Sequence, residues 1–231
     1  MLFRSHLHLA ETQLQVEQSL QRTGKTSFRC LYDAGGFDLP VLVAHGLWIT
    51  EEDLAYINQN TWFAFCPKTY MRLASGRGGF FEYESRLQYS FGSDGAASSG
   101  TVNPLEQARL FAMLEKFNKD EATLHPAVEI WQRLMAGHTV FRAETGKIEE
   151  NAAADLVIWD LQTPDTMAYY HPVSAILYGA NSSNVRYTMV EGEFLKYNGA
   201  LKMDFASITK EAMQLQKALL SRGKGTAKVY Y

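Results

Sequence analysis

Two histidines and a glutamate near the start of the sequence have types and spacing that could do chemistry. The chain reads His6-Leu7-His8, and Glu11 follows His8 by three residues. Side chains alternate between the faces of a strand, so His6 and His8 share a face and Glu11 lies just beyond the strand end. A histidine and a carboxylate there could supply a metal ligand and a general acid or base. Taken alone, the same spacing more often marks a capped helix start.

Two further polar groups follow apolar runs in the same way. His45 comes directly after Pro40–Ala44, and Asp94 lies between glycines in Gly92-Ser93-Asp94-Gly95, after Leu87–Phe91. A single histidine at a strand end is more often structural, and Asp with Gly is typical of turns. However, parallel α/β folds place their active sites beyond the carboxyl ends of strands. Because all three groups follow strands in order, with loops long enough to line a pocket, we expect them to form one site.

Strands alternating with helices must position these residues. The expected strands are Leu2–Ala10, Pro40–Ala44, Thr61–Phe65 and Leu87–Phe91. The expected helices are Glu11–Gln21, one that starts at Thr50–Asp53, one opened by Asn103-Pro104, and Ala127–Ala136, with a loop over Pro67–Gly79 between them. An Asn cap followed by Pro is a strong helix start. The order of elements predicts a parallel α/β region that ends at about residue 145.

The remainder of the chain has a β-rich pattern. It contains the expected strands Ala154–Trp159 and Val185–Val190, turns at Glu191-Gly192 and Asn198-Gly199, and a final amphipathic helix, Ser207–Leu220. Apolar alternation bounded by such turns is typical of antiparallel strands. The sequence therefore predicts two parts, 1–145 and 146–231.

Composition and charge exclude several classes of function. The 231 residues are 46% hydrophobic, and 22 basic against 25 acidic residues give a net charge of -3. Without a basic run, nucleic acid or an anionic membrane surface is not expected as a partner. Cys30 and Cys66 cannot form a disulfide framework, and no apolar stretch approaches the roughly 20 residues of a membrane helix. We expect a cytoplasmic protein.

The polar motifs together resemble the amidohydrolase superfamily, in the branch that contains guanine, adenosine-analogue and S-adenosylhomocysteine deaminases and triazine chlorohydrolases. The motifs that carry the resemblance are His8-Leu9-Ala10-Glu11-Thr12, Ala44-His45-Gly46, Cys66-Pro67 with Arg72-Leu73-Ala74-Ser75-Gly76, and Gly92-Ser93-Asp94-Gly95-Ala96-Ala97-Ser98. Their order and separations fit one and then two β/α units of the family barrel. The resemblance covers roughly residues 3 to 200.

The resemblance implies a role for each polar residue. His8 would be the metal ligand after barrel strand 5, and Glu11 the proton shuttle to the substrate ring nitrogen and the leaving group. His45, after strand 6, would hydrogen-bond the substrate or the tetrahedral centre. Asp94, after strand 8, would bind the metal and take a proton from the attacking water. The implied cofactor is one divalent metal, zinc or iron, which lowers the pKa of its bound water.

One departure concerns the first barrel strand, which in the superfamily supplies a His-x-His pair of metal ligands. His6-Leu7-His8 could imitate that pair, but Ala10-Glu11-Thr12 and the short run to His45 fit strand 5 better. We therefore expect the C-terminal half, strands 5–8, of a TIM-like (β/α)8 barrel over 1–145. A partial β-sandwich domain with a C-terminal helix would follow over 146–231. A complete barrel takes about 250 residues, and a half barrel leaves two strand edges unpaired.

The implied reaction is hydrolysis of a non-peptide carbon–nitrogen bond by a metal-activated water. We expect deamination of a small heterocyclic amine such as a purine, pyrimidine, pterin or triazine. His45, Trp48 and Arg72 are the expected substrate contacts, and Tyr70 is expected to line the pocket with Trp48 and Arg72. Ordinary packing at the barrel rim explains Trp48, Tyr70 and Arg72 equally well.

Three explanations of a half barrel stay open: a fragment of a larger hydrolase, which we favour, a partner chain that carries strands 1–4, or a homo-oligomer. In each, His8 and Asp94 alone are too few ligands to hold a metal tightly. We therefore expect a metal that is weakly held or absent and a chain that is inactive or nearly so. The alternative function is a catalytically inactive half barrel that acts as a dimerisation or interaction module. The presence of Glu11, His45 and Asp94 favours descent from a catalyst.

Overall fold

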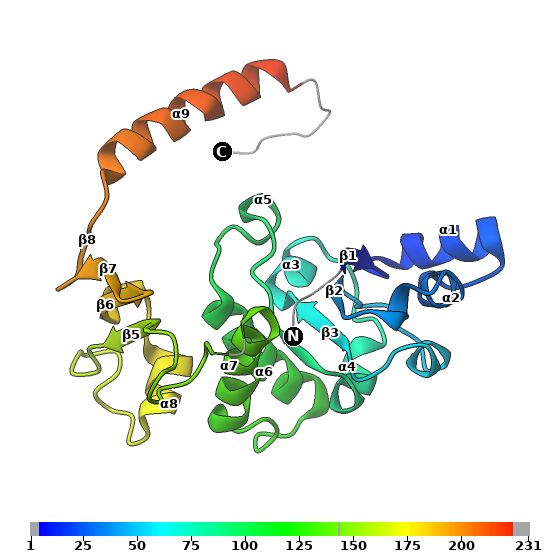
Figure 1. Ribbon diagram of the computed structural model, residues 1–231, viewed down its shortest axis with the longest axis horizontal. Coiled ribbons are helices and arrows are strands. Elements are labelled where there is room, and N and C mark those ends of the chain that lie inside the picture. The colour runs from blue at the N-terminus through cyan, green and yellow to red at the C-terminus, as the bar shows by residue number, and fades with distance from the viewer. Residues whose placement is uncertain (1–4, 143, 224–231) are drawn as a thin grey trace. The chain divides into compact units, whose positions relative to one another are not determined.

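The computed structural model describes residues 5–142 and 144–223, which form two compact units (Figure 1). The first unit extends to Ala153 and includes Leu161–Asn181. Among the described residues, the second unit comprises Ala154–Asp160 and Ser182–Gly223. None of the described helices is both long and apolar enough to cross a membrane.

A parallel four-stranded sheet forms the centre of the first unit. Its strands are β1 (Ser5–Leu9), β2 (Val41–His45), β3 (Thr61–Phe65) and β4 (Tyr89–Phe91), paired in the order β1-β2-β3-β4. All four expected strands are thus confirmed, and the α/β class with them. The part of the first expected strand before Ser5 lies outside the described residues.

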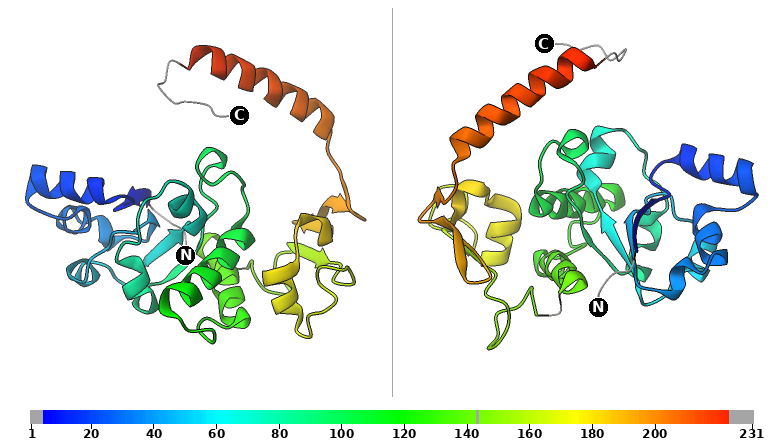
Figure 2. Two further views of the ribbon diagram at one scale, coloured as in Figure 1. Left: turned by 180° about the vertical axis from the view of Figure 1, so that it is seen from behind. Right: turned by 45° about the horizontal axis from the view of Figure 1, so that its top comes forward.

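Helices connect and follow these strands, as a parallel sheet requires. Between the strands lie α1 (Gln13–Thr23), α2 (Ser27–Asp33), η1 (Gly36–Asp38), η2 (Glu52–Ala55), α3 (Pro67–Arg72), α4 (Phe80–Tyr83) and η3 (Glu84–Arg86). After β4 come α5 (Ala96–Ser99), α6 (Pro104–Lys119), α7 (Ala127–Phe141), α8 (Pro172–Ser174) and η4 (Ala175–Gly179). In two further views, α1 and α2 (blue) lie on one side of the parallel strands and α6 and α7 (green) on the other (Figure 2).

Local capping explains where the main helices begin. The Thr12 hydroxyl accepts a hydrogen bond from the backbone N–H of Gln15, and the Gln15 side-chain oxygen accepts one from the backbone N–H of Thr12. This capping box starts α1. The Asn103 side chain accepts the N–H groups of Leu105 and Glu106 at the start of α6, as the Asn-Pro pair predicted. The helix expected from Thr50 is only a short 3-10 turn, η2, at whose start the Asp53 carboxylate accepts hydrogen bonds from the backbone N–H and the hydroxyl of Thr50.

The prediction of a loop over Pro67–Gly79 is wrong for its first six residues, which form the helix α3. Pro67 occupies the first turn of α3, where its missing N–H has no cost. Tyr70 and Thr69 on this helix are buried. Because α3 directly follows β3, it brings the Tyr70 side chain behind the carboxyl end of the sheet.

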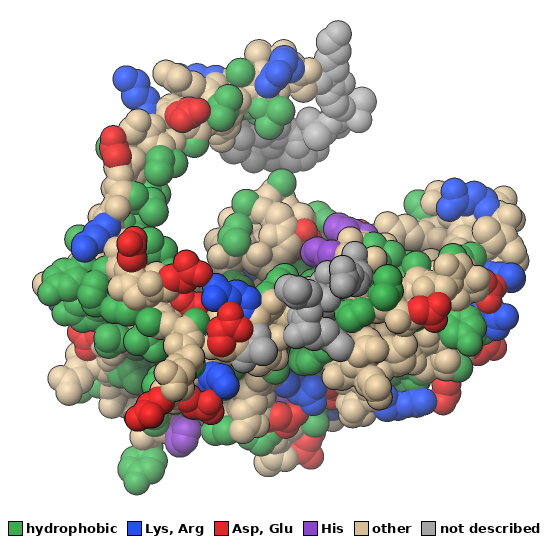
Figure 3. Space-filling model, viewed as in Figure 1, with side chains coloured by type: hydrophobic (Ala, Val, Ile, Leu, Met, Phe, Trp, Pro, Cys, Tyr) green, Lys and Arg blue, Asp and Glu red, His purple; other side chains and the backbone are tan. Residues whose placement is uncertain are grey.

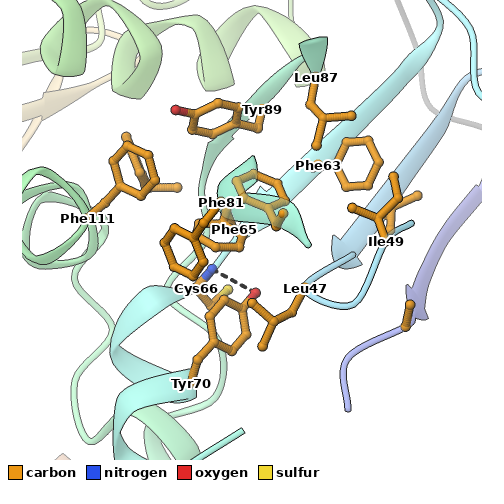
Figure 4. Packing of buried hydrophobic residues seen from close by; sticks show 14 of the residues in the cluster. Leu47, Ile49, Phe63, Phe65, Cys66, Tyr70, Phe81, Leu87, Tyr89 and Phe111 are labelled. Carbon is orange, nitrogen blue, oxygen red and sulfur yellow. Dashed lines mark hydrogen bonds between the residues drawn. The ribbon is translucent and has the colours of Figure 1, made fainter. Parts of the chain in front are cut away.

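One face of the sheet packs against a cluster of aromatic rings (Figure 4). Phe63 and Phe65 of β3 and Tyr89 of β4 point into it and are almost completely buried. The Phe65 ring stacks on that of Phe80, with centroids 3.6 Å apart. The alternate residues of the same strands, including Trp62 and Ala64, point to the opposite face, as the period of a strand requires.

The second unit contains an antiparallel sheet and a helix. Its strands are β5 (Leu156–Trp159), β6 (Val185–Val190), β7 (Glu193–Tyr197) and β8 (Ala200–Leu201), paired in that order. The short 3-10 helix η5 (Ser182–Asn184) comes directly before β6, and the helix α9 (Phe205–Arg222) follows β8. The turns expected at Glu191-Gly192 and Asn198-Gly199 are confirmed, since all four residues have positive φ.

Candidate active site

A cavity of about 520 Å³ lies at the second face of the parallel sheet, within the first unit. Alternate side chains of all four strands line it, together with residues of α7. Its ionisable lining residues are His6, His8, His45, Cys66, Asp94 and His138. Histidine side chains gather on this part of the first unit, beside hydrophobic ones (Figure 3). The shared lining by His6 and His8 agrees with the strand alternation expected from the sequence.

His8 and His45, which line this cavity, form a compact group with the nearby Glu11. The parallel register pairs Leu9 with His45, so the ends of β1 and β2 are adjacent. His45 Nε2 lies 3.1 Å from His8 Nδ1. Each of these nitrogens lies 3.7 Å from Glu11 Oε2. The His45 side chain is 2% exposed, whereas those of Glu11 and His8 are 21% and 63% exposed. The group is therefore anchored on a buried imidazole and open on the His8 side.

The backbone at the strand ends is in a conformation that ordinary residues rarely adopt. Ala10, His45 and Asp94 have φ values of 47°, 74° and 55°. Positive φ outside glycine is uncommon and concentrates at functional sites. It turns the chain sharply after β1, β2 and β4. Three of the strand ends that carry polar groups are thus held in strained turns.

The His45 ring contacts Tyr70 through the ring nitrogen that lies farther from His8 and Glu11. His45 Nδ1 lies 3.2 Å from the hydroxyl of Tyr70 on α3. Burial lowers the pKa of His45, and the carboxylate of Glu11 acts against that shift. The imidazole is therefore neutral at neutral pH. The sequence predicted Tyr70 as a residue that lines the pocket beside Trp48 and Arg72; its hydroxyl instead contacts His45, and its side chain does not line the cavity.

Asp94 contributes a carboxylate from the turn after β4. Burial acts to raise its pKa, but a 2.6 Å hydrogen bond from the Gly95 N–H and other favourable contacts leave it below the ordinary value. Asp94 is therefore ionised at neutral pH. Burial raises the pKa of the nearby Cys66 thiol to about 12, so Cys66 is a neutral part of the wall.

The donor atoms fit a divalent metal ion. Among the described residues, one atom each of His8, Glu11 and His45 lie within 4.8 Å of one another. Two ligands with bonds of about 2.0–2.1 Å to a tetrahedral zinc ion lie roughly 3.3 Å apart, close to the spacings found here. Nitrogen and carboxylate donors are also the ligand types that zinc accepts. Asp94 lines the same cavity but is not a member of this group.

Two of the expected substrate contacts lie elsewhere. The Trp48 Nε1–H donates to the Ser75 carbonyl oxygen at 2.9 Å, and Arg72 Nη1 donates to the Ser98 carbonyl oxygen at 3.0 Å. Neither side chain lines the cavity, so both hold loops in this structure. Their contact with a substrate stays a prediction. His138, by contrast, lines the cavity and was missed because the expected helix ended at Ala136, before the end of α7.

Comparisons with known proteins agree with the motifs. The pattern of the amidohydrolase family matches residues 3–195. The 5-methylthioadenosine/S-adenosylhomocysteine deaminase of Aquifex aeolicus is 31% identical over 221 residues, which are 94% of this chain and 51% of the relative. The 5'-deoxyadenosine deaminase of Methanopyrus kandleri is 32% identical over 221 residues, 93% of this chain and 51% of the relative.

Solved structures of similar proteins carry zinc. An adenosine deaminase from Xanthomonas campestris with bound zinc superimposes with a TM-score of 0.86 at 25% identity, over 94% of this chain and 51% of that one. The atrazine chlorohydrolase of Arthrobacter aurescens TC1, in complex with zinc, gives a TM-score of 0.80 at 25% identity, over 92% of this chain and 48% of that one. The chain thus spans about half the length of the relatives it matches.

Proposed function

The chain belongs to the amidohydrolase family, and from this premise we propose that it carries catalytic residues of a deaminase that hydrolyses a purine-like ring amine. The observation that carries the proposal is that His8, His45 and Asp94 line one cavity at the carboxyl ends of parallel strands, with the Glu11 carboxylate 3.7 Å from both imidazoles. Support for the substrate class comes from relatives named as deaminases of methylthioadenosine, S-adenosylhomocysteine and deoxyadenosine.

We propose further that β1–β4 correspond to strands 5–8 of an eight-stranded barrel, with 1–145 as the barrel half and 146–231 as a partial β-sandwich domain with a C-terminal helix. Within 146–231, the segment Leu161–Asn181 belongs to the first compact unit. The parallel order of the four strands supports this assignment, as does the match to about half of each relative. A complete barrel takes about 250 residues. The other four strands would come from a segment equivalent to the unmatched half of the relatives, or from a second chain that covers the open face.

His8 and Asp94 are the residues that we propose as metal ligands. The zinc in the two similar structures favours zinc over iron. A divalent ion held there would supply a water molecule with a pKa near neutrality. Two protein ligands hold such an ion weakly, since catalytic zinc sites use three.

The remaining residues move protons and orient the ring. Deamination replaces the amino group by the oxygen of water, and the two protons of that water end on the ring nitrogen and on the departing ammonia. Glu11 is placed to carry these protons, because its carboxylate is partly exposed and faces both imidazoles. Asp94, which is ionised, takes one of the two protons from the water and gives it up again for delivery to the departing ammonia, so both carboxylates end the reaction as they began it. His45 orients the substrate from the buried side of the site.

Zinc binding tests this assignment in the chain itself. Titration of the purified chain with zinc against a competing chelator dye should reveal one weak site. His8→Ala and Asp94→Ala should each abolish it, while the matched control His171→Ala, at an exposed histidine, should retain it. Ammonia release from 5'-methylthioadenosine by the zinc-loaded chain alone should be absent or nearly so. Equal zinc affinity in all four proteins would overturn the ligand assignment.

A further inference from the structure

Three side chains in a row connect the buried core to the cavity. The Tyr70 hydroxyl lies 3.1 Å from the backbone nitrogen of Cys66 and 3.2 Å from His45 Nδ1. On the other side of the ring, His45 Nε2 lies 3.1 Å from His8 Nδ1. Figure 4 shows the Tyr70 hydroxyl turned toward the Cys66 nitrogen, beneath the rings of the aromatic cluster. The row therefore links a backbone group to the open edge of the site.

The backbone group sets the direction of the hydrogen bonds. The N–H of Cys66 can only donate, so the Tyr70 oxygen accepts from it. Tyr70 is 4% exposed, and a buried hydroxyl needs an acceptor for its own proton. Among the described residues, the hydrogen-bond partners of this hydroxyl are the Cys66 nitrogen and His45 Nδ1. Tyr70 therefore donates to His45 Nδ1.

This direction determines which nitrogen of His45 carries the proton. A neutral imidazole has one N–H donor and one acceptor nitrogen. We propose that Tyr70 is a positioning residue that fixes His45 in the tautomer protonated at Nε2, so that His45 faces the site as a hydrogen-bond donor and is kept from binding metal. The Nε2–H then donates to His8 Nδ1, 3.1 Å away.

The positions of the donor atoms alone allow His45 Nε2 to be either a metal ligand or a hydrogen-bond donor, and the tautomer decides between these two roles. His45 Nε2 belongs to the group of three atoms that could hold an ion, and a ligating nitrogen must offer its lone pair. With the proton on Nε2 that lone pair is not available. The use of the His45 Nε2–H group in catalysis rests on the proposed function, whereas the tautomer of His45 does not.

The packing of Tyr70 makes the constraint rigid. Its ring lies against that of Phe65, with centroids 5.0 Å apart, and against the His45 ring at 5.7 Å. The side chain comes from α3, which begins directly after the strand that carries Phe65. The side chain is 4% exposed, so these neighbours keep the hydroxyl beside His45 Nδ1 without bound substrate.

Nitrogen NMR of the unaltered chain tests the tautomer directly. The two ring nitrogens of a neutral histidine differ in 15N shift according to which one is protonated. In metal-free protein at about pH 8, His45 should show the pattern of protonated Nε2, with its signals assigned by their loss in His45→Gln. A pattern of protonated Nδ1, or an equal mixture, would overturn the proposal. Neither result depends on enzymatic activity or on zinc binding.

A tyrosine variant tests the consequence for metal binding. Tyr70→Phe removes the donor to Nδ1, so Nε2 can offer its lone pair to an ion. A net hydrogen-bond contribution near 1 kcal/mol predicts a rise in zinc affinity of roughly fivefold. The matched control is Tyr83→Phe, a half-buried tyrosine at the edge of the same core, which should leave zinc affinity unchanged. Folded Tyr70→Phe with unchanged or lower zinc affinity would contradict the proposal, and if this variant does not fold, the NMR of the unaltered chain decides.

Discussion

Replacing Phe65 by alanine should lower the free energy of unfolding of the chain by about 3–5 kcal/mol. The Phe65 side chain is completely buried at the end of β3. Its ring lies within 6.4 Å, centroid to centroid, of five other aromatic rings, those of Tyr70, Phe80, Phe81, Tyr89 and Phe111. These neighbours come from one strand, β4, and three helices, α3, α4 and α6, that pack around β3. The surroundings can therefore close only part of the cavity that the substitution leaves, which places the expected loss at the upper end for a core residue.

Urea unfolding followed by far-ultraviolet circular dichroism measures this loss. The matched control is Phe117→Ala, the same change at a side chain that is 82% exposed on α6. The control should change the unfolding free energy by less than about 0.5 kcal/mol. A more conservative change, Phe65→Leu, keeps much of the volume and should lose less than Phe65→Ala.

A small effect would refute this reasoning. If Phe65→Ala lost less than about 1.5 kcal/mol, with the denaturant dependence unchanged, the aromatic cluster would not be a close-packed core. The position of Tyr70 behind His45 would then lack its support, because the Phe65 ring is one of the surfaces on which Tyr70 rests.

Three further predictions follow from single residues. Burial raises the pKa of Glu115 in the folded chain. At pH values between the ordinary carboxyl pKa and this raised pKa, the folded chain therefore binds more protons than the unfolded chain, and the free energy of unfolding falls as the pH rises. Glu115→Gln should therefore unfold at higher urea than the parent at pH 7 and at the same urea near pH 4; equal midpoints at both pH values would contradict this. Because burial raises the pKa of Cys66 to about 12, iodoacetamide at pH 8 should alkylate the half-buried Cys30 and spare Cys66, and equal labelling by mass spectrometry would disagree. Asn103→Ala removes the cap of α6 and should lower the unfolding free energy by about 1 kcal/mol, so an unchanged urea midpoint would exclude that role.

Much of the fold could be predicted from local sequence. The bounds of β3 and β6 agree with the expected Thr61–Phe65 and Val185–Val190, because β-branched and aromatic residues alternate there and turn residues flank them. The start of α6 could also be predicted from Asn103-Pro104, because a helix cap depends only on residues within one turn. Signals of this kind depend on residues a few positions apart.

The candidate site was predictable in composition but not in its contacts. Strand ends of a parallel sheet meet at one edge, which is sufficient to bring His8 and His45 together. The contact of Tyr70 with His45 joins residues 25 positions apart through a helix that the sequence concealed, because Pro67 and the glycines from Gly76 onward favoured a loop. The tautomer of His45 depends on that contact and could not be derived without it.

Ammonia release by a fusion protein tests the central claim most directly. In this fusion, the part of the Aquifex aeolicus relative that this chain does not match is joined before residue 5. With zinc bound, the fusion should release ammonia from 5'-methylthioadenosine. Glu11→Gln should reduce that rate by about 10²-fold or more, whereas Glu17→Gln, at an exposed residue of α1, should not. A folded, zinc-loaded fusion that releases no ammonia, or one in which Glu11→Gln is fully active, would contradict the assignment of this chain as the catalytic half of a deaminase.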